Sequence, residues 1–466
     1  MPLTFAAETD AALPLVLVET AGAEAWLASL PERPRAWARA QGFSGKLHSL
    51  VVLPGETGAP EAAAFGWGDA KARGRDRFHL AKAAEALPEG VWRLATALDP
   101  DEAGAEALGW LLAGYRFERY RKQGGGRARL VAPAGIDAAR IEAIAAGEAL
   151  TRDLINTPAS DMGPAEIEAA AVALAEEFGA TATAIRGDDL LERGFPMIHA
   201  VGRASPRAPR LIELGWGDSG PKLTLVGKGV AFDTGGLDIK PAASMGLMKK
   251  DMGGAATVLG LARMVMALNL PLRLRVLIPA VENAISGGAF RPQDILASRK
   301  GLTVEINNTD AEGRLILADA LAYACEGEAP DCLISMATLT GAARVALGPD
   351  LPPFFTDSEA LAEALAAGAA RARDPLWRMP FWEPYEALIE PGIADLDNAP
   401  SGGMAGAVTA ALFLRRFVAE TVPYAHFDIY GWQPKPAPGR PKGGVGQGAR
   451  ALLAALLAAP EGALFG

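Results

Sequence analysis

Apolar positions follow two patterns over the C-terminal two-thirds of this chain. Short apolar runs typical of buried strands occur at residues 211–214, 223–227, 274–280, 302–306 and 332–337. Longer runs rich in Ala and Leu predict helices at residues 165–178, 255–268 and 315–324. Because strands and helices alternate, we expect an α/β domain with a mostly parallel central sheet. Its functional groups should gather at the carboxyl ends of the strands.

The first third of the chain repeats these patterns on a smaller scale. Residues 14–18 and 47–53 predict strands, and residues 81–86 predict a helix. A chain of 466 residues is also too long for one ordinary core. We therefore expect a small N-terminal α/β domain over residues 1–135, a linking helix over 136–158 and a catalytic α/β domain over 159–466. Pro158 should end the linking helix, because it disfavours the α conformation at Thr157.

Composition and charge narrow the class of protein. The chain is 50% hydrophobic and 21% charged, as is ordinary for a globular enzyme. Its net charge of −10 disfavours a protein that coats nucleic acid. Two cysteines, Cys325 and Cys332, are too few for a disulfide framework, and no uncharged apolar run is long enough to cross a bilayer. The N-terminus lacks the basic region of a signal peptide. We therefore expect a soluble cytoplasmic protein.

Polar segments that follow two of the predicted strands carry the candidate chemistry. They contain the carboxylates Asp233, Asp251, Asp310 and Glu312. Carboxylates at close range repel one another, and a pair of divalent cations about 3.5–4 Å apart relieves that repulsion while activating a water. Individually, an Asp in a glycine-rich turn is most often a turn former, and Glu312 could cap the next helix. Their combination favours a two-metal hydrolase.

Other classes of enzyme find little support in the sequence. It contains no His-Glu-x-x-His zinc helix, no Gly-x-Ser-x-Gly elbow and no phosphate-binding loop. One rival is a two-metal phosphoesterase or nuclease, which nitrophenyl phosphate would distinguish from a peptidase. A rival of another class is a nucleic-acid-binding regulator that uses the basic runs at 71–77 and 116–122. The acidic total favours a solvated face for these runs, and a salt-sensitive mobility shift would test binding.

Five segments resemble the leucyl aminopeptidase (cytosol aminopeptidase) family. They are residues 226–236, 248–256, 308–315, 338–342 and 404–407, of which 308–315 looks like the family's signature octapeptide. The spacing Lys228-x4-Asp233-x6-Lys240-x10-Asp251 agrees as well. The resemblance covers about residues 151–453 and is weak over 1–135. It departs at 431–438, which is richer in proline than the family pattern.

The resemblance implies a metal-dependent aminopeptidase that removes the N-terminal residue from peptides with a free amine, using a hydroxide that bridges two metals. Asp233 and Glu312 would bridge the metals. The implied metal ligands are Lys228, Asp233, Asp251, Asp310 and Glu312. Lys240 would stabilise the oxyanion, and Arg314 would hold a bicarbonate ion as general base. The implied substrate-binding residues are Lys240, Met248, Asn308 and Thr338.

The resemblance also implies a homohexamer that binds two divalent metal ions. The ligand set suits zinc or manganese, with magnesium or cobalt as further options. Lys228 is an unusual ligand, because a free lysine has a pKa of about 10.4 whereas a metal ligand must be neutral. The cations would therefore have to hold its amine deprotonated.

Overall fold

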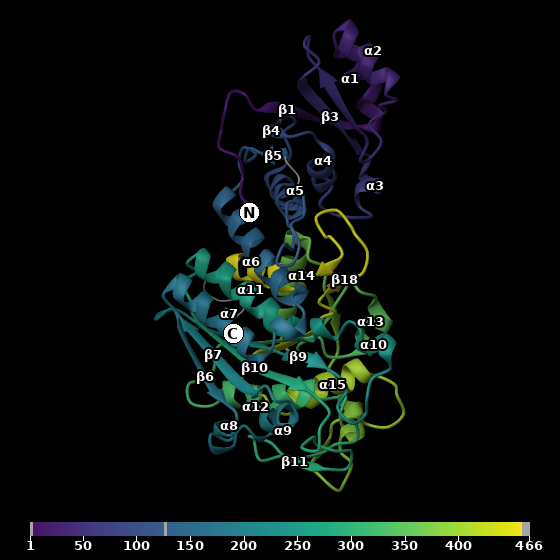
Figure 1. The fold of residues 1–466 in the computed structure, drawn as a ribbon. Helices are drawn as coiled ribbons and strands as arrows, with labels where there is room; N and C mark the ends of the chain where they lie inside the picture. The colour runs from purple at the N-terminus through teal and green to yellow at the C-terminus, as the bar shows by residue number, and fades with distance from the viewer. Residues whose placement is uncertain (1–2, 125–127, 459–466) are drawn as a thin grey trace. The chain divides into compact units, whose positions relative to one another are not determined.

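The computed structural model describes residues 3–124 and 128–458, which divide into two compact units (Figure 1). The first unit lies within Met1–Ala149 and Lys435–Lys442, and the second lies within Leu150–Pro434 and Gly443–Gly466. The division falls inside helix α6 (Ala138–Asn156), within the linking segment expected at 136–158. As predicted, this helix ends before Pro158.

The first unit is a five-stranded sheet with helices on both faces. Its strands are β1 (Leu13–Glu19), β2 (Leu50–Pro54), β3 (Pro60–Gly68), β4 (Gly90–Leu94) and β5 (Ala128–Leu130), in the order β2-β3-β1-β4-β5. Its helices are α1 (Ala23–Ser29), α2 (Glu32–Ala40), α3 (Ala70–Arg73), α4 (Leu80–Ala86) and α5 (Pro100–Ala113). Side chains alternate along β1, so Leu15 and Leu17 pack with α4 and α5 while Val16 and Val18 pack with α1 and α2. The expected small α/β domain is confirmed.

The proline-rich departure from the family pattern is divided between the two units, with 431–434 in the second and 435–438 in the first. Residues 435–442 run between β18 (Trp432–Gln433) and β19 (Gly443–Gly444) and group with the first unit. Arg440 forms an ion pair there with Asp76. None of the described residues from 432 to 442 lines the pocket described below.

The second unit is built on a nine-stranded sheet. Its strands are β6 (Thr181–Arg186), β7 (Arg210–Trp216), β8 (Lys222–Gly227), β9 (Gly229–Asp233), β10 (Arg273–Asn283), β13 (Cys332–Ala337), β14 (Pro353–Phe355), β15 (Trp377–Met379) and β17 (Tyr424–Asp428). The order is β15-β14-β17-β13-β8-β10-β7-β6, and β9 pairs with the C-terminal part of β10. The central strands β17, β13, β8 and β10 are parallel, and so are β14 and β15. Strand β14 pairs antiparallel with β17, and β7 pairs antiparallel with both β10 and β6. The predicted mostly parallel sheet is confirmed.

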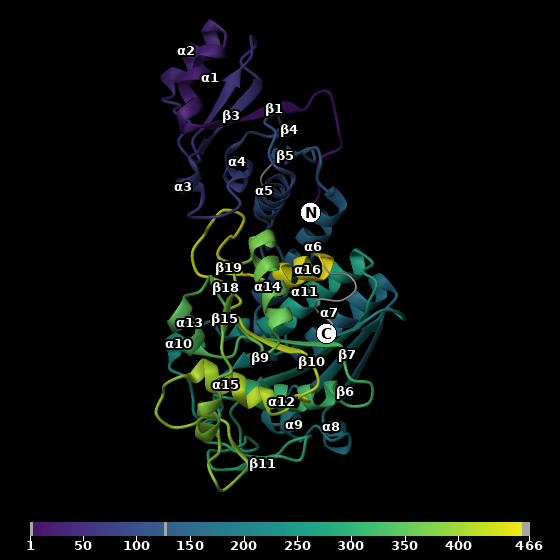
Figure 2. The same cartoon turned by 180° about the vertical axis from the view of Figure 1, so that it is seen from behind.

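Helices cover both faces of this sheet (Figures 1 and 2). On one face lie α7 (Pro164–Phe178), α11 (Gly253–Ala267), α14 (Glu359–Ala372) and α16 (Ala449–Ala458). On the other lie α8 (Asp189–Glu192), α9 (Pro196–Gly202), α12 (Gly313–Ala324) and α15 (Gly406–Arg415). Helix α11 is apolar nearly all round and is buried accordingly. Within the described ranges, no helix is both long and apolar enough to cross a membrane.

One predicted strand lies outside the central sheet. The run at 302–306 forms β12 (Thr303–Glu305), which pairs with β11 (Ile295–Ala297) and β16 (Leu396–Asp397) in a separate three-stranded sheet. Asp310 and Glu312 therefore do not follow a strand of the central sheet. They lie instead at the start of α12, which packs against β8 and β10.

Candidate active site

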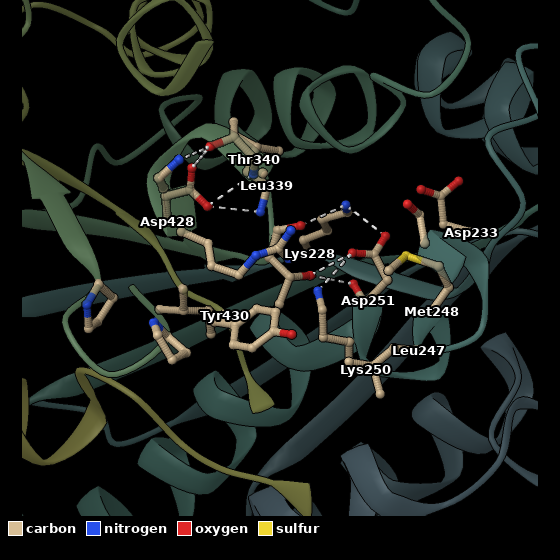
Figure 3. Close-up of a pocket in the computed structure, with 18 of the residues that line it drawn as sticks. Lys228, Asp233, Leu247, Met248, Lys250, Asp251, Leu339, Thr340, Asp428 and Tyr430 are labelled. Atoms are coloured by element: carbon tan, nitrogen blue, oxygen red, sulfur yellow. Dashed lines mark hydrogen bonds and ion pairs between the residues drawn. The ribbon is translucent and has the colours of Figure 1, made fainter. Parts of the chain in front are cut away.

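A pocket with a volume of about 560 Å³ opens in the second unit (Figure 3). Among its lining residues are seven of the predicted site residues, namely Lys228, Asp233, Lys240, Met248, Asp251, Asp310 and Thr338. Lys228 and Asp233 come from the junction of β8 and β9 and from the end of β9. Met248 and Asp251 come from the 3₁₀ helix η3 (Met248–Met252), and Thr338 directly follows β13. Asn308, Glu312 and Arg314 are not in the lining.

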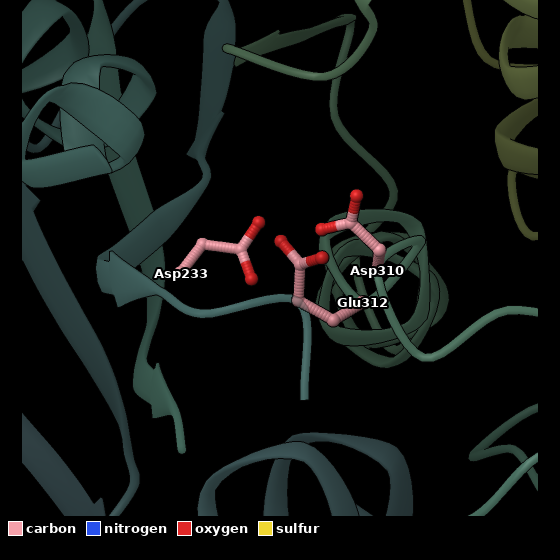
Figure 4. Close-up of side chains that lie close together, drawn as sticks. All are labelled: Asp233, Asp310 and Glu312. Atoms are coloured by element: carbon pink, nitrogen blue, oxygen red, sulfur yellow. The ribbon is translucent and has the colours of Figure 1, made fainter. Parts of the chain in front are cut away.

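Three carboxylates converge beside this pocket (Figure 4). Asp233, Asp310 and Glu312 each offer an oxygen, and these oxygens lie within 4.8 Å of one another. Asp233 and Glu312 are 2% and 1% exposed. Glu312 stands immediately before α12, yet its side chain makes no capping hydrogen bond. Glu312 therefore occupies the N-cap position of α12 without capping through its side chain, and its carboxylate faces the other two.

Lys228 joins two of the buried carboxylates. Its Nζ lies 2.8 Å from Asp251 Oδ2 and 3.0 Å from Glu312 Oε1, and it donates to the carbonyl oxygen of Thr338 at 3.2 Å. Burial lowers the pKa of Lys228, but the charges of Asp251 and Glu312 raise it by more, so the net shift is upward. This ammonium group is therefore a positive charge shared by the two carboxylates.

Lys240 places a positive charge between the other two carboxylates, Asp233 and Asp310. Its Nζ lies 2.8 Å from Asp233 Oδ2 and also forms an ion pair with Asp310. Burial lowers the pKa of Lys240, and the nearby charges of Asp233 and Glu312 raise it by more. Each lysine therefore lies between two carboxylates, and the four carboxylates of the cluster surround two positive charges.

The carboxylates remain incompletely satisfied despite these lysines. Burial, followed by repulsion from Asp233, raises the pKa of Glu312 to about 8 and that of Asp310 to about 6. Among the described residues, buried Asn283 Oδ1 accepts no hydrogen bond, and Lys228 Nζ is the single close partner of buried Glu312 Oε1 and Asp251 Oδ2. Buried oxygens with free lone pairs are costly in an apolar surrounding and suit a hard or borderline cation. The residues present therefore fit divalent metal ions.

Neighbouring polar groups orient these carboxylates. Asp233 Oδ1 accepts from Asn283 Nδ2 at 2.8 Å and from the amide of Gly235 at 2.9 Å. Thr338 Oγ1 donates to Asp251 Oδ1 at 2.8 Å. Such contacts fix the direction of the oxygens that remain free.

Two glycines allow the close packing that this arrangement requires. Gly235 has a φ of +87°, and a side chain there would approach the carbonyl oxygen of Asp238 to 2.5 Å. A Cβ at Gly313 would lie 2.5 Å from Cε of Lys228. Substitution at either position would displace the backbone or the lysine beside the carboxylates.

Asn308 and Arg314 lie near the cluster but are engaged elsewhere. Asn308 Oδ1 accepts from the amide of Asp310 at 2.8 Å, which shapes the loop that carries this carboxylate. Arg314 Nη1 donates to the carbonyl oxygen of Asn398 at 2.5 Å, while its buried Nε has no hydrogen-bond partner among the described residues. Burial lowers the pKa of Arg314 to about 10, even though the charge of Glu312 opposes this shift.

The pocket also contains residues that the sequence analysis missed. Asp428 ends β17 and accepts from the amides of Leu339 and Thr340 and from Thr340 Oγ1, at 3.0, 3.1 and 2.5 Å. Burial raises the pKa of Asp428 to about 6 and lowers that of Lys250, in η3, to about 8. Asp428, and Asn283 behind the pocket lining, both stand at the carboxyl ends of strands, so the strand-end rule would have found them had both strands been located to their last residue.

Known proteins resemble this chain in sequence and fold. The model of the cytosol aminopeptidase family catalytic domain matches residues 149–453, and that of the M17 aminopeptidase N-terminal domain matches residues 13–133. A probable cytosol aminopeptidase of Roseiflexus castenholzii is 43% identical over 375 residues, 76% of each chain. The crystal structure of a cytosol aminopeptidase from Coxiella burnetii is 44% identical with a TM-score of 0.94, covering 98% of this chain and 100% of that one. The bottromycin maturation enzyme BotP in complex with Mn is 32% identical with a TM-score of 0.85, covering 97% of this chain and 100% of that one.

Proposed function

This chain belongs to the cytosol aminopeptidase family and is therefore a peptidase, and on that premise we propose that it removes the N-terminal residue from peptides at a centre of two divalent cations. The convergence of three carboxylates within 4.8 Å of one another, two of them almost wholly buried, carries the proposal. When bound, the cations would hold the substrate's α-amine, polarise the scissile carbonyl and supply a hydroxide at neutral pH.

The chain's own residues would hold and orient these cations. The proposed ligands are Lys228, Asp233, Asp251, Asp310 and Glu312, with Asp233 and Glu312 shared between the two positions. Lys228 would give up its proton as a ligand, since an ammonium group cannot donate a lone pair. Its place between Asp251 and Glu312 supports this assignment.

Lys240 and Arg314 would act on the substrate and on the proton. Lys240 is the cation of the pocket that contacts both Asp233 and Asp310, and from there its ammonium would stabilise the developing oxyanion. Arg314 would hold a bicarbonate ion as general base, using the donors that Asn398 leaves free. Met248 and Thr338 would border the substrate's first side chain, and Asn308 would contribute by shaping the loop of Asp310.

The identity of the metals and the setting of the enzyme belong to the same proposal. Manganese or zinc is the first choice, with magnesium or cobalt as further options; the manganese complex of BotP supports manganese. We expect a homohexamer that works in the cytoplasm. Large apolar side chains exposed on the second unit, such as Val345, Ile393 and Met404, support an assembly that covers part of this surface.

The decisive experiment compares three substrates with one preparation of the metal-loaded protein. A leucyl anilide should be hydrolysed, its N-acetylated form should resist hydrolysis because it lacks a free amine, and nitrophenyl phosphate should be untouched. Rapid cleavage of the N-acetylated anilide would contradict an aminopeptidase. Preferential cleavage of the phosphate would contradict a peptide-hydrolysing centre.

A further inference from the structure

Four cationic side chains line the pocket, and they fall into two kinds. Lys228 and Lys240 each lie within 3.0 Å of a carboxylate oxygen. Among the described residues, the one carboxylate contact of Lys250 is Asp251 Oδ1, at 4.0 Å. The side chain of Arg344 makes no hydrogen bond or ion pair with any residue that the structure describes. Two of the four cations therefore lack a close acidic partner.

Lys250 is the more unusual of this second pair. It is only 5% exposed, and its ammonium group makes no hydrogen bond to any described residue. Its Nζ lies 5.3 Å from the centroid of the Tyr430 ring (Figure 3). Lysines are rarely buried without a partner, because removing the charge from water is costly.

Arg344 extends the same positive region. It projects from α13 (Gly341–Leu347), and its Cζ lies 5.0 Å from the centroid of the Tyr430 ring. Tyr430 thus has a cation from each of two separate segments over its ring. Contacts between a cation and an aromatic ring are weaker than ion pairs with a carboxylate. They leave the N–H donors of Lys250 and Arg344 free to bind a carboxylate.

The carboxylates that the structure describes in this pocket are engaged elsewhere, and Asp233 and Asp310 both pair with Lys240. Both oxygens of Asp428 are taken by the donors of Leu339 and Thr340. Asp251 Oδ1 accepts from Thr338, and its Oδ2 faces Lys228. The missing anion would therefore come from a ligand.

We propose that Lys250 and Arg344 bind the side-chain carboxylate of an acidic N-terminal residue, so that the enzyme favours peptides that begin with Asp or Glu. This inference rests on the proposed function, which places the substrate's amine and scissile carbonyl at the carboxylate cluster. Lys250 lines the same pocket as the cluster, with Nζ 4.0 Å from the Asp251 carboxylate, so a first residue held at the cluster by its amine would have its side chain within reach of Lys250. Leu247, Met248 and Tyr430 offer apolar surface for its methylene groups.

The same chemistry could come from the C-terminal carboxylate of a dipeptide, and a substrate panel separates the two sources. Glutamyl and glutaminyl anilides have the same shape, differ in one charge and lack a C-terminal carboxylate. We expect kcat/KM to favour glutamyl by about tenfold or more, as for a charge-assisted hydrogen bond in a desolvated site. Equal rates for the two anilides would overturn the proposal. The proposal would also be overturned if glutaminyl dipeptides were cleaved faster than their C-terminal amides while the two anilides were cleaved equally. That result would assign the two cations to the C-terminal carboxylate.

Variants assign the preference to these two cations. Lys250→Met and Arg344→Gln should each bring the glutamyl-to-glutaminyl ratio towards one, and Arg344→Glu, on an exposed position, should favour lysyl over glutamyl anilide. Lys249→Gln is the matched control, because it removes a charge from the same turn while its Nζ bonds to the carbonyl oxygen of Asn156, outside the pocket lining. A ratio that survives in both Lys250→Met and Arg344→Gln would contradict the assignment.

A binding measurement provides a readout that does not depend on turnover. Free L-glutamate should bind the metal-loaded parent protein more tightly than L-glutamine does, by about tenfold. Lys250→Met should abolish this difference, and persistence of the difference would overturn the proposal. The panel also separates the two levels of inference. Cleavage of leucyl and glutaminyl anilides without a glutamyl preference contradicts only this inference, whereas no cleavage of any anilide contradicts the proposed function.

Discussion

Helix α12 carries two buried carboxyl groups that meet opposite surroundings. Glu312 stands at its start and Asp319 in its middle, and they are 1% and 0% exposed. Asp319 accepts hydrogen bonds from the backbone amides of Met197, Ile198 and Arg299 at 2.8, 3.3 and 2.8 Å. Glu312 Oε1 has no backbone donor among the described residues, and its close partner is Lys228 Nζ at 3.0 Å.

The difference shows which feature marks a functional acid. Burial raises the pKa of both groups, to about 8 for Glu312 and about 7 for Asp319, so a raised pKa does not distinguish them. The lone pairs of Asp319 accept hydrogen bonds that hold the start of α9 and the backbone of Arg299 in place. Glu312 keeps a lone pair free among other carboxylates. Incomplete coordination among like charges is the sign of a metal centre.

The largest expected effect comes from neutralising the cluster. The double variant Asp310→Asn plus Glu312→Gln should lower kcat/KM for a leucyl anilide by about a thousandfold or more, because ligands of the metals are lost. Circular dichroism should show an intact fold, since the change also removes charge repulsion. Asp319→Asn is the matched control, and its folded fraction should keep metal-dependent activity. Parent-like turnover in the double variant would erase the distinction between the two acids.

Lys240 tests whether the charge balance also serves the reaction. Lys240→Met should lower kcat by about a hundredfold to a thousandfold, as loss of an oxyanion donor does. The KM should change much less, because the amine and carbonyl of the substrate would still be held. Steady-state kinetics on the metal-loaded variant measure both values. An unchanged kcat would assign Lys240 a purely structural part.

The pH dependence of metal binding gives a smaller but distinct signal. Below pH 8 Glu312 is protonated in the metal-free protein, so a cation must expel that proton and the proton on Lys228. The dissociation constant for Mn²⁺ should therefore rise by about tenfold or more for each unit by which the pH falls from 8 to 6. Titration calorimetry in buffers of different ionisation enthalpy measures the affinity and the protons released. An affinity that is constant with pH would contradict this coupling.

The same shift predicts how stability depends on pH. The folded pKa of Glu312, about 8, lies above its ordinary value of 4.5. Its contribution to the stability of the metal-free fold is therefore fully present below pH 4.5 and is lost as pH rises through 8. Glu312→Gln should flatten this fall in the melting temperature.

The smallest expected effect comes from Asp319, whose carboxyl group accepts hydrogen bonds from three backbone amides. Asp319→Asn replaces one accepting oxygen with a donor that faces backbone amides, so the free energy of unfolding should fall by about 1–3 kcal/mol. Urea unfolding measures the loss, and Asp218→Asn on the exposed surface serves as the control. Catalysis per folded molecule should not change. A loss of metal binding in Asp319→Asn with an intact fold would contradict its structural role.

Periodicity predicted the elements whose apolar runs are unbroken. The run at 332–337 matches β13, and the run at 315–324 matches most of α12. Strand β17 escaped notice because it contains His426 and Asp428. Both are fully buried, but they are accommodated by contacts with Ser335 and Thr340, which only the tertiary structure brings near. Local pattern carries no information about such partners.

The site divides in the same way. The cluster could be predicted because its members lie in compact motifs, whereas no motif contains Lys250, Arg344 and Tyr430 together. They come from η3, from α13 and from the segment after β17, and the fold alone brings them to one pocket. The separate sheet of β12 also could not be foreseen, because an apolar run does not specify its pairing partner.

Metal removal and return test the central claim most directly. After exhaustive chelation the parent protein should lose its peptidase activity, and titration with Mn²⁺ should restore it as about two ions bind per chain. The Asp310→Asn plus Glu312→Gln variant should recover neither binding nor activity. Full activity in the chelated parent, or recovery without bound metal, would contradict a centre in which these buried carboxylates hold two cations.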